Sequence, residues 1–154
     1  MKRLLPLFAL ALVSGCVSAP KALQGPFAPI APGDAVRAGT TGESVRWGGR
    51  IVEVEPQSTR TCFEVVSVRL GADGRPTRQD QSSGRFLACR PGFYDPQIFK
   101  PGREITLSGR VTGFEDRKIG EYDYRYPRID ADVVYLWPER RNVDVIIERH
   151  PFWW

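Results

Sequence analysis

The chain has 154 residues, which is enough for one domain with its own hydrophobic core. Its 15 glycines and 13 prolines are many for a helical protein and favour short strands joined by turns. The 22 basic and 18 acidic residues give a formal net charge of +4, and Lys2 and Arg3 are two of those basic residues. Without these two the charge is nearly balanced, which argues against a nucleic-acid partner.

The first fifteen residues have the pattern of an export signal. Lys2 and Arg3 precede an apolar run from Leu4 to Val13. This run is too short to span a membrane as a helix, because that takes roughly 20 residues. The string VSGC that follows resembles the bacterial lipobox, in which the cysteine becomes the lipidated N-terminus. We expect a signal peptide over residues 1–15 and acyl chains on Cys16, the alternative being an ordinary signal peptide with a chance cysteine.

Residues 16–41 are predicted to form the lipidated N-terminus and a flexible tether. They contain four prolines and several glycines, and proline-rich chain extends by about 3.1 Å per residue. Phe27 and Ile30 are the part of this segment that we expect to lie along the domain, if any part does. Val17 follows the cysteine where enterobacterial inner-membrane lipoproteins tend to have Asp, and this resemblance favours the outer membrane.

Five segments between residues 42 and 140 alternate apolar and polar side chains as half-buried strands do. They are VRWGGRIVEVE, TCFEVVSVRL, RFLACR, EITLSGRVTGF and RIDADVVYLW. In the first segment the apolar positions shift from odd to even across Gly48-Gly49, which predicts a β-bulge and a bent strand. EDRKIG is predicted to be a turn. Residues 141–154 are predicted to add a short strand and an aromatic tail, which docks on the domain or anchors at a membrane interface.

Five strands, a bent first strand and no long helical pattern predict an all-β fold. The favoured architecture is a small five-stranded OB-like barrel, whose connection between the fourth and fifth strands often contacts ligands. A β-sandwich is the alternative.

Cys62 and Cys89 are the two cysteines that remain once Cys16 carries lipid. A hairpin of the second and third strands brings them together, and disulfides persist in exported proteins. A bridge between them closes a loop of 27 residues, for which the chain-entropy model gives ~3–4 kcal/mol. The alternative is a pair of buried thiols that pack as small apolar groups.

The string KIGEYDYRYP places Tyr122, Tyr124 and Tyr126 at alternate positions, so an extended chain turns all three to one side. If the alternation continues along the strand, this side is the outer face that also carries Asp130 and Asp132. Two interpretations stay open. The row is either aromatic cover that pairs across strands, or a contact surface for an envelope protein or a glycan.

No catalytic, metal or cofactor site is predicted. The one histidine, His150, lies near the end of the chain, and the G-x-S-x-G string of serine hydrolases is missing. Two cysteines and one distant histidine do not suit zinc. Carboxylates cluster on predicted turns and outer strand faces, where they are usually solvated; they are Glu115, Asp116, Glu121, Asp123, Asp130 and Asp132.

Several short strings together resemble the Slp family of starvation-inducible outer-membrane lipoproteins. Between Gly39 and Pro138 they are VRWGGRIV, GRFLA, GFYDP, GREITLSGRVTG, KIGEYDYRYP and LWP, and the lipobox precedes them. Their order and spacing carry the resemblance more than any single string does. The family supplies no catalytic residues, and the cysteine pair is not part of its pattern.

The resemblance implies a lipid-anchored protein of the Gram-negative outer membrane that is linked to starvation or stationary phase. We therefore expect a non-catalytic domain on the periplasmic side that supports the envelope by binding a protein or glycan partner. One alternative is an OB-type module for cell-wall oligosaccharide, and another is an enzyme that acts on glycan.

Overall fold

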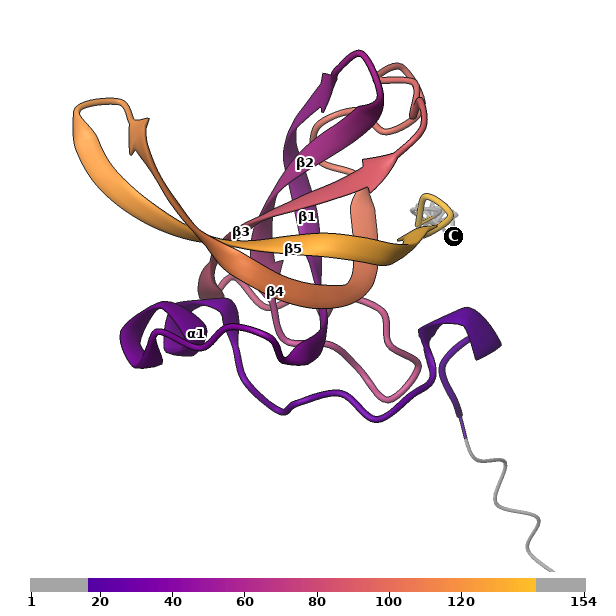
Figure 1. Cartoon of the computed structure of the whole chain (residues 1–154). Coiled ribbons are helices and arrows are strands. Elements are labelled where there is room, and N and C mark those ends of the chain that lie inside the picture. The colour runs from indigo at the N-terminus through magenta and orange to yellow at the C-terminus, as the bar shows by residue number, and fades with distance from the viewer. Residues whose placement is uncertain (1–16, 141–154) are drawn as a thin grey trace, which may run out of the picture.

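The computed structural model describes residues 17–140, which form five strands and two short helical segments (Figure 1). The elements are η1 (Lys21–Leu23), α1 (Pro32–Ala38), β1 (Ser44–Pro56), β2 (Arg60–Val68), β3 (Ser82–Pro91), β4 (Glu104–Ile119) and β5 (Tyr122–Leu136). No helix within residues 17–140 is long and apolar enough to cross a membrane. The predictions for Cys16, His150 and the tail 141–154 lie outside the described residues.

The five strands belong to one sheet that closes into a ring in the order β1-β2-β3-β5-β4. Four neighbouring pairs are antiparallel, and β3 and β5 are parallel. The chain reaches this parallel arrangement through β4, which lies on the other side of β5. The prediction of a mainly β fold with five strands is confirmed. Because all the strands share a single sheet, the structure is not the two-sheet sandwich of the alternative.

β1 bends because one residue is inserted in its pairing with β2. The register shifts between Ile51 and Glu53, so the inserted residue is Val52. β1 therefore has a bulge near the predicted place, but at Val52 and not at Gly48-Gly49. The inward alternation continues past the two glycines to Ile51, which is 2% exposed. Gly49 serves another purpose, since a Cβ there would lie 1.8 Å from the carbonyl oxygen of Val66.

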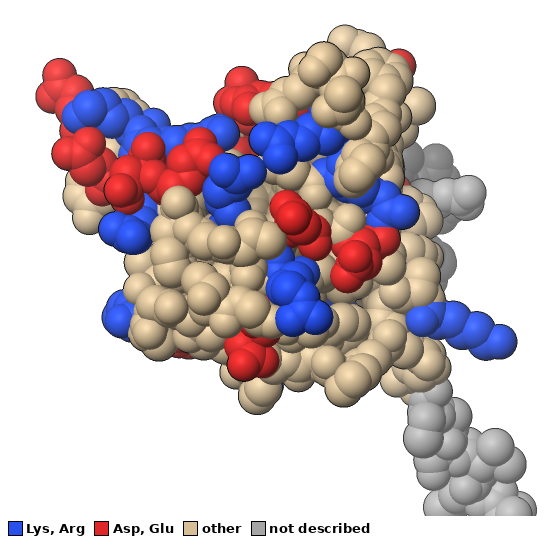
Figure 2. Space-filling model, viewed as in Figure 1, with Lys and Arg blue, Asp and Glu red and all other residues tan. Residues whose placement is uncertain are grey.

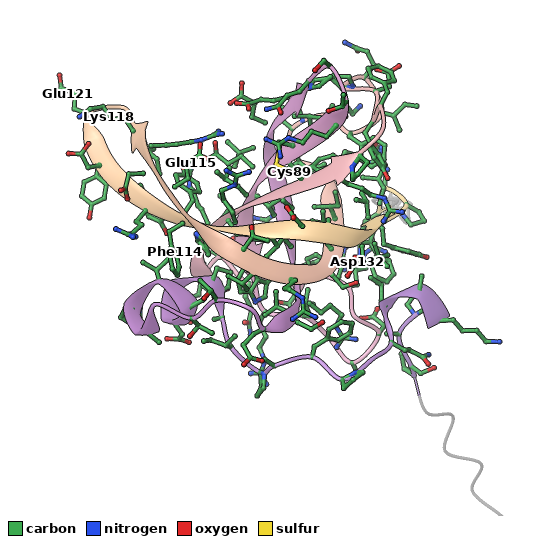
Figure 3. All side chains as sticks on the ribbon, in the orientation of Figure 1. Cys89, Phe114, Glu115, Lys118, Glu121 and Asp132 are labelled. Carbon is green, nitrogen blue, oxygen red and sulfur yellow. A yellow bond between two sulfur atoms is a disulfide. The ribbon has the colours of Figure 1, made fainter. Side chains whose placement is uncertain are left out.

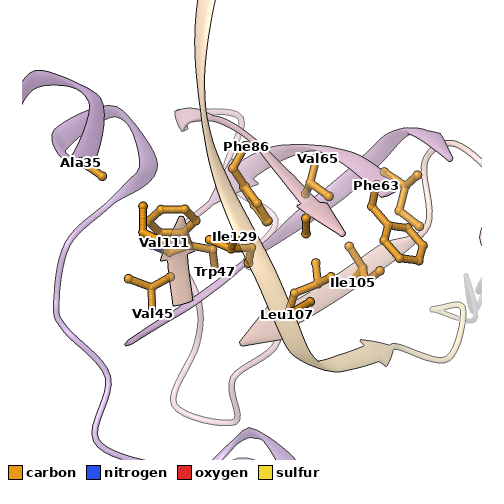
Figure 4. Packing of buried hydrophobic residues seen from close by; sticks show 13 residues of the cluster. Ala35, Val45, Trp47, Phe63, Val65, Phe86, Ile105, Leu107, Val111 and Ile129 are labelled. Atoms are coloured by element: carbon orange, nitrogen blue, oxygen red, sulfur yellow. The ribbon is translucent and has the colours of Figure 1, made fainter. Parts of the chain in front are cut away.

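The inside of the ring holds a cluster of thirteen buried residues (Figure 4). At one end of this core lies Ala35 of α1, which is fully buried beyond Val45. At the other end the loop between β3 and β4 places Tyr94 and Phe99 against Phe63, with ring centroids 5.4 and 5.6 Å from it. Burying a large apolar side chain contributes ~1.5–3 kcal/mol, so this core is the main support of the ring.

Residues 19–41 do not form the predicted flexible tether, because they pack against the ring. Leu23 and Ala35 are fully buried. α1 starts with a proline and is followed by Gly39, whose φ of 63° is common in the residue that caps a helix. The indole Nε1 of Trp47 donates to the carbonyl oxygen of Ile30 over 2.7 Å. The tether prediction is wrong here. A segment rich in proline and small residues can be a flexible tether, but it can equally be an extended segment that packs on a sheet and accepts hydrogen bonds from its side chains.

β4 and β5 form a longer hairpin than the sequence predicts. The sequence predicts a turn at EDRKIG, but the strands stay paired as far as Ile119 and Tyr122. Only Gly120 and Glu121 connect them, and Gly120 has a φ of 61°. A glycine with positive φ at the first of two connecting residues is typical of a type II′ hairpin turn.

Candidate functional site

The hairpin extends beyond the ring as a two-stranded arm, residues 113–127 (Figure 1). β4 pairs with β1 only as far as Arg110, and β5 pairs with β3 only from Arg128 onward. Among the described strands, each strand of the arm therefore pairs only with the other. A two-stranded hairpin is at best marginally stable alone, so the position of the arm depends on its contacts with the ring.

One face of the arm carries the tyrosine row. Directly opposed residues of antiparallel strands share a face, and the three tyrosines lie opposite Ile119, Arg117 and Glu115. The ring centroids are 6.5 Å apart for Tyr122 and Tyr124 and 4.9 Å apart for Tyr124 and Tyr126. The structure thus places the three tyrosines together on one side of an extended strand, as their spacing predicts.

The exposure of the row falls from the tip of the arm to its base. Tyr122 is 69% exposed, Tyr124 is half-buried and Tyr126 is 1% exposed. The contact-surface interpretation is therefore wrong for Tyr126, because a side chain with almost no exposed surface cannot meet a partner. Tyr126 is aromatic cover, and a contact role stays a hypothesis for Tyr122 and the exposed part of Tyr124.

Tyr126 joins an ion pair on the outer side of the ring. Its hydroxyl donates to Oε1 of Glu64 over 3.0 Å, and Arg85 donates to the same oxygen over 2.7 Å. Burial, together with the hydrogen bond to the Glu64 carboxylate, raises the pKa of Tyr126 above its ordinary value. Desolvation works against the charge of Arg85, but the bonds with Glu64 and Tyr126 outweigh it, so the pKa of Arg85 is raised too. These contacts link β2, β3 and β5.

Tyr124 ties the arm to the start of β3. Its hydroxyl oxygen accepts the backbone N–H of Arg85 over 3.1 Å. A Cβ at Gly84 would lie 2.9 Å from the backbone nitrogen of Gly33 in α1 and 3.5 Å from the Tyr124 hydroxyl. The base of the arm, the first residues of β3 and α1 therefore meet in a tightly packed corner.

A notch lies between the arm and the ring, and its walls carry charges of both signs (Figure 2). Arg117 donates to Oε1 of Glu115 over 2.6 Å and lies 3.3 Å from Oε1 of Glu55. Arg128 lies 3.4 Å from the other oxygen of Glu115, and Figure 3 shows Glu115 between the arm and the ring. Desolvation lowers the pKa of Arg117, but the hydrogen bonds and charges of Glu115 and Glu55 have a larger effect, so the pKa of Arg117 is raised overall.

The notch residues are Glu55, Glu64, Arg85, Glu115, Arg117 and Arg128, and every strand supplies at least one of them. Three are acidic and three are basic, so the notch has no net charge. It offers hydrogen-bond donors and acceptors together, and Tyr122 and the exposed part of Tyr124 add aromatic faces. This combination suits a polar chain with hydroxyl or amide groups better than a polyanion.

Glu64 and Arg85 are members of this site that the sequence does not single out. The sequence shows only that both residues take outward positions in the alternation of β2 and β3. Many surface residues share this property, so it does not identify a site. Their pairing with Tyr126 depends on β3 and β5 being neighbours, which only the closed ring shows.

The remaining carboxylates of the arm lie on its other face or at its tip. Lys118 and Asp123 are 2.9 Å apart, and Arg125 and Asp116 are 3.8 Å apart. Glu121 lies at the tip, close to Lys118 (Figure 3). Asp130 and Asp132, farther along β5, are exposed. Within residues 17–140 no group of three or more His, Cys, Asp or Glu is placed to hold a metal ion.

A disulfide joins Cys62 of β2 to Cys89 of β3. The two cysteines are direct partners in the strand register, and their Cα atoms are 4.0 Å apart. They belong to the same alternating set as Glu64 and Arg85, so the bridge is on the outer side of the sheet. It therefore fixes the register of the two strands on which Tyr126 rests.

Comparison with protein families gives a match over nearly the whole chain. Residues 13–154 match the Outer membrane lipoprotein Slp family. The match extends beyond the strings between Gly39 and Pro138, and it includes Cys16 and the C-terminal tail. The family resemblance is thereby confirmed.

Three curated relatives agree with this match. The chain is 39% identical over 124 residues to the uncharacterized lipoprotein YeaY of Escherichia coli K12, covering 77% of this chain and 63% of YeaY. It is 34% identical over 147 residues to an uncharacterized protein of Haemophilus influenzae Rd, covering 89% and 78% of the two chains. It is 24% identical over 138 residues to outer membrane protein Slp of E. coli K12, covering 86% and 73%. The chain thus spans less than two thirds of the length of YeaY. On the family match over residues 13–154 and these relatives, the chain belongs to the Slp family of outer membrane lipoproteins.

Proposed function

We propose that lipid on Cys16 anchors the chain in the outer membrane and that the arm and notch bind a protein or glycan of the envelope on the periplasmic side. The role is support of the envelope in starvation or stationary phase, without catalysis. In this proposal the ring is an OB-like barrel, which is supported by its five strands, its bent β1 and the long connection between β4 and β5. The lipid anchor is supported by the family and by the VSGC string.

The observation that carries this proposal is the contrast within the tyrosine row. Tyr124 and Tyr126 hold the arm with hydrogen bonds to Arg85 and Glu64, while Tyr122 stays 69% exposed. A rigid base with an exposed aromatic tip lowers the entropy cost of binding, because the contact surface is already in place. Tyrosine is also among the residues most enriched at protein contacts.

The ion pairs of the notch support a binding role over an enzymatic one. A glycan-cleaving pair needs one carboxylic acid that keeps its proton and a second carboxylate across a cleft. Glu64 instead accepts bonds from Arg85 and Tyr126, and Glu115 and Glu55 both face Arg117. The three carboxylates are therefore already paired with groups of the chain and not with each other across a cleft.

Site-specific photo-crosslinking in intact envelopes tests the proposal. A photoreactive residue replaces Tyr122 in one variant and Arg37 in the control, because the Arg37 side chain is 75% exposed on α1, which packs beside the base of the arm and not at its exposed tip. We expect a discrete adduct from position 122 and none from position 37. Adducts of equal yield at both positions, or at neither, would contradict a contact role for the arm.

Purified cell-wall sacculi separate the glycan alternative from a protein partner. If the notch binds oligosaccharide, the chain sediments with sacculi, and Tyr122→Ala weakens this without changing the melting temperature. If the partner is a protein, sacculi leave the chain in solution while the crosslinked adduct still forms. The anchor is tested separately by mass spectrometry of the native protein, in which Cys16 should carry acyl chains at the N-terminus.

A further inference from the structure

Only a short piece of chain separates Cys16 from the folded domain. Ala19 is 8% exposed and belongs with Leu23 and Trp137 to a small apolar cluster beside the main core. Three residues of fully extended chain span about 10 Å. If Cys16 carries lipid as proposed, this side of the domain must therefore lie close to the headgroups of the membrane.

A pocket of about 390 Å³ opens beside this cluster. Trp137 lines the pocket and also packs with Ala19 and Leu23, so this residue connects the pocket with the segment that leads to the anchor. Figure 1 shows the end of β5 and η1 on the same side of the molecule. The pocket and the attachment to the membrane therefore share one side of the domain, and the arm extends from another.

The lining of the pocket is mainly cationic, with four basic and two acidic side chains. The basic ones are Arg50, Lys100, Arg103 and Arg140. Of the acidic ones, Glu104 is already bonded to two arginines, since Nε of Arg140 lies 2.9 Å and Nε of Arg75 2.6 Å from its oxygens. Glu139 pairs with Lys100 and Arg103 at 3.6 and 3.7 Å, and the four basic and two acidic side chains of the lining leave a formal net charge of +2.

Arg103 has a donor that no acceptor within residues 17–140 satisfies. Its Nη groups donate to the carbonyl oxygens of Ile98 and Trp137 over 3.2 and 2.9 Å, but its Nε is buried without a hydrogen bond to any of the described residues. Oε1 of Glu139 is 3.7 Å from this nitrogen, an ion-pair distance that is too long for a hydrogen bond. Glu139 is 63% exposed, so an anionic oxygen could displace its carboxylate and supply the missing acceptor.

We infer that this pocket binds the phosphate of an anionic phospholipid headgroup in the membrane that holds the anchor. Guanidinium groups match the geometry of phosphate oxygens, and lysine adds a mobile point charge. The location of the pocket relative to the membrane rests on the proposed lipidation of Cys16. The chemistry of the pocket does not, since it depends only on the described side chains.

Vesicle binding by the chain from Val17 to Trp154 tests the pocket without the anchor, and this chain keeps every helix and strand of the structure. We expect it to sediment with phosphatidylcholine vesicles that contain phosphatidylglycerol and to stay in solution with phosphatidylcholine alone. Arg50→Glu combined with Lys100→Glu should weaken binding by roughly 30-fold or more, from about fivefold for each cation near an anionic surface. Arg50 is exposed and the Lys100 side chain is 57% exposed, so the fold should tolerate both changes.

The matched control is Lys118→Glu combined with Arg125→Glu, which makes the same change of charge on the arm. It should leave vesicle binding within a factor of about two or three, because charges more than a Debye length of about 10 Å from the membrane are screened. Equal losses in the two double variants, or binding of neither vesicles nor inorganic phosphate by the unaltered chain, would overturn the pocket. Pocket-dependent binding of inorganic phosphate without binding to vesicles would overturn the lipid assignment. An unmodified Cys16 in native protein would instead overturn the anchor and leave the vesicle result intact.

Discussion

The ring and the arm are built from the same two long strands but are held by different forces. In the ring β4 and β5 have neighbours on both sides and cover a core that includes fully buried Phe86 and Leu107. In the arm the same strands have only each other, and polar contacts at the base fix their direction. Hydrophobic burial thus determines the stability of the ring, while hydrogen bonds and ion pairs determine where the arm lies.

This difference separates two kinds of substitution. A change in the core should lower the free energy of unfolding of the whole domain. A change at the base of the arm should alter the arm locally, because local openings need not involve the cooperative core. A binding surface on the arm can therefore vary without loss of the fold.

The largest effect is expected from Phe86→Ala in the ring. Phe86 is fully buried, and its ring centroid lies 5.3 Å from that of Trp47 in an edge-on contact. The cavity left by the truncation should lower the free energy of unfolding by ~3–5 kcal/mol. Chemical denaturation measures this value, with Phe114→Ala as the arm control, because Phe114 is only half-buried. Losses of equal size in both variants would remove the distinction between ring and arm.

The two regions also differ in how far the sequence predicts them. The strands of the ring were predictable, because each has one buried side and therefore alternates. Cys62 and Cys89 could be placed on neighbouring strands for the same reason. In the arm, EDRKIG reads as a turn and not as a paired strand, because its charges alternate on two faces that are both largely solvated.

The sequence also does not predict how the N-terminal segment packs or which bonds form at the base of the arm, and the reason is different. The buried state of Leu23 depends on Trp137, which lies more than a hundred residues later in the chain. The role of Tyr126 depends on Glu64, and no local pattern relates the two. Both contacts follow from the closure of the sheet, which places distant segments side by side.

The second largest effect is expected from loss of the disulfide in the ring. Reduction, or Cys62→Ser with Cys89→Ser, opens a loop of 27 residues and should lower the free energy of unfolding by ~3–4 kcal/mol in the chain-entropy model. Denaturation curves with and without reductant measure the loss. The double serine variant is the control, because its stability should not respond to reductant. A reductant response in that variant would assign the effect to something other than the bridge.

A smaller and local effect is expected from Tyr126→Phe at the base of the arm. The substitution removes the hydroxyl that donates to Glu64 but keeps the ring. Hydrogen bonds to charged groups contribute ~1.5–3 kcal/mol, and the loss should lie at the low end because Arg85 still satisfies Glu64. Hydrogen exchange should become faster in residues 113–127 and change little in β1 and β2. Tyr122→Phe, at the exposed end of the row, is the control and should leave both regions unchanged.

The smallest effect is a dependence of stability on alkaline pH. The pKa of Tyr126 is raised in the folded protein by burial and by Glu64, so between the unfolded and the folded pKa the folded state holds a proton that the unfolded state has released. The contribution of Tyr126 is therefore complete below its unfolded pKa, about 10, and declines as pH rises through the folded pKa. Unfolding curves of the wild type and of Tyr126→Phe should differ at neutral pH and converge as this contribution is lost at high pH. A difference that stays constant across this range would mean that the hydroxyl stabilises the arm without any change in its pKa.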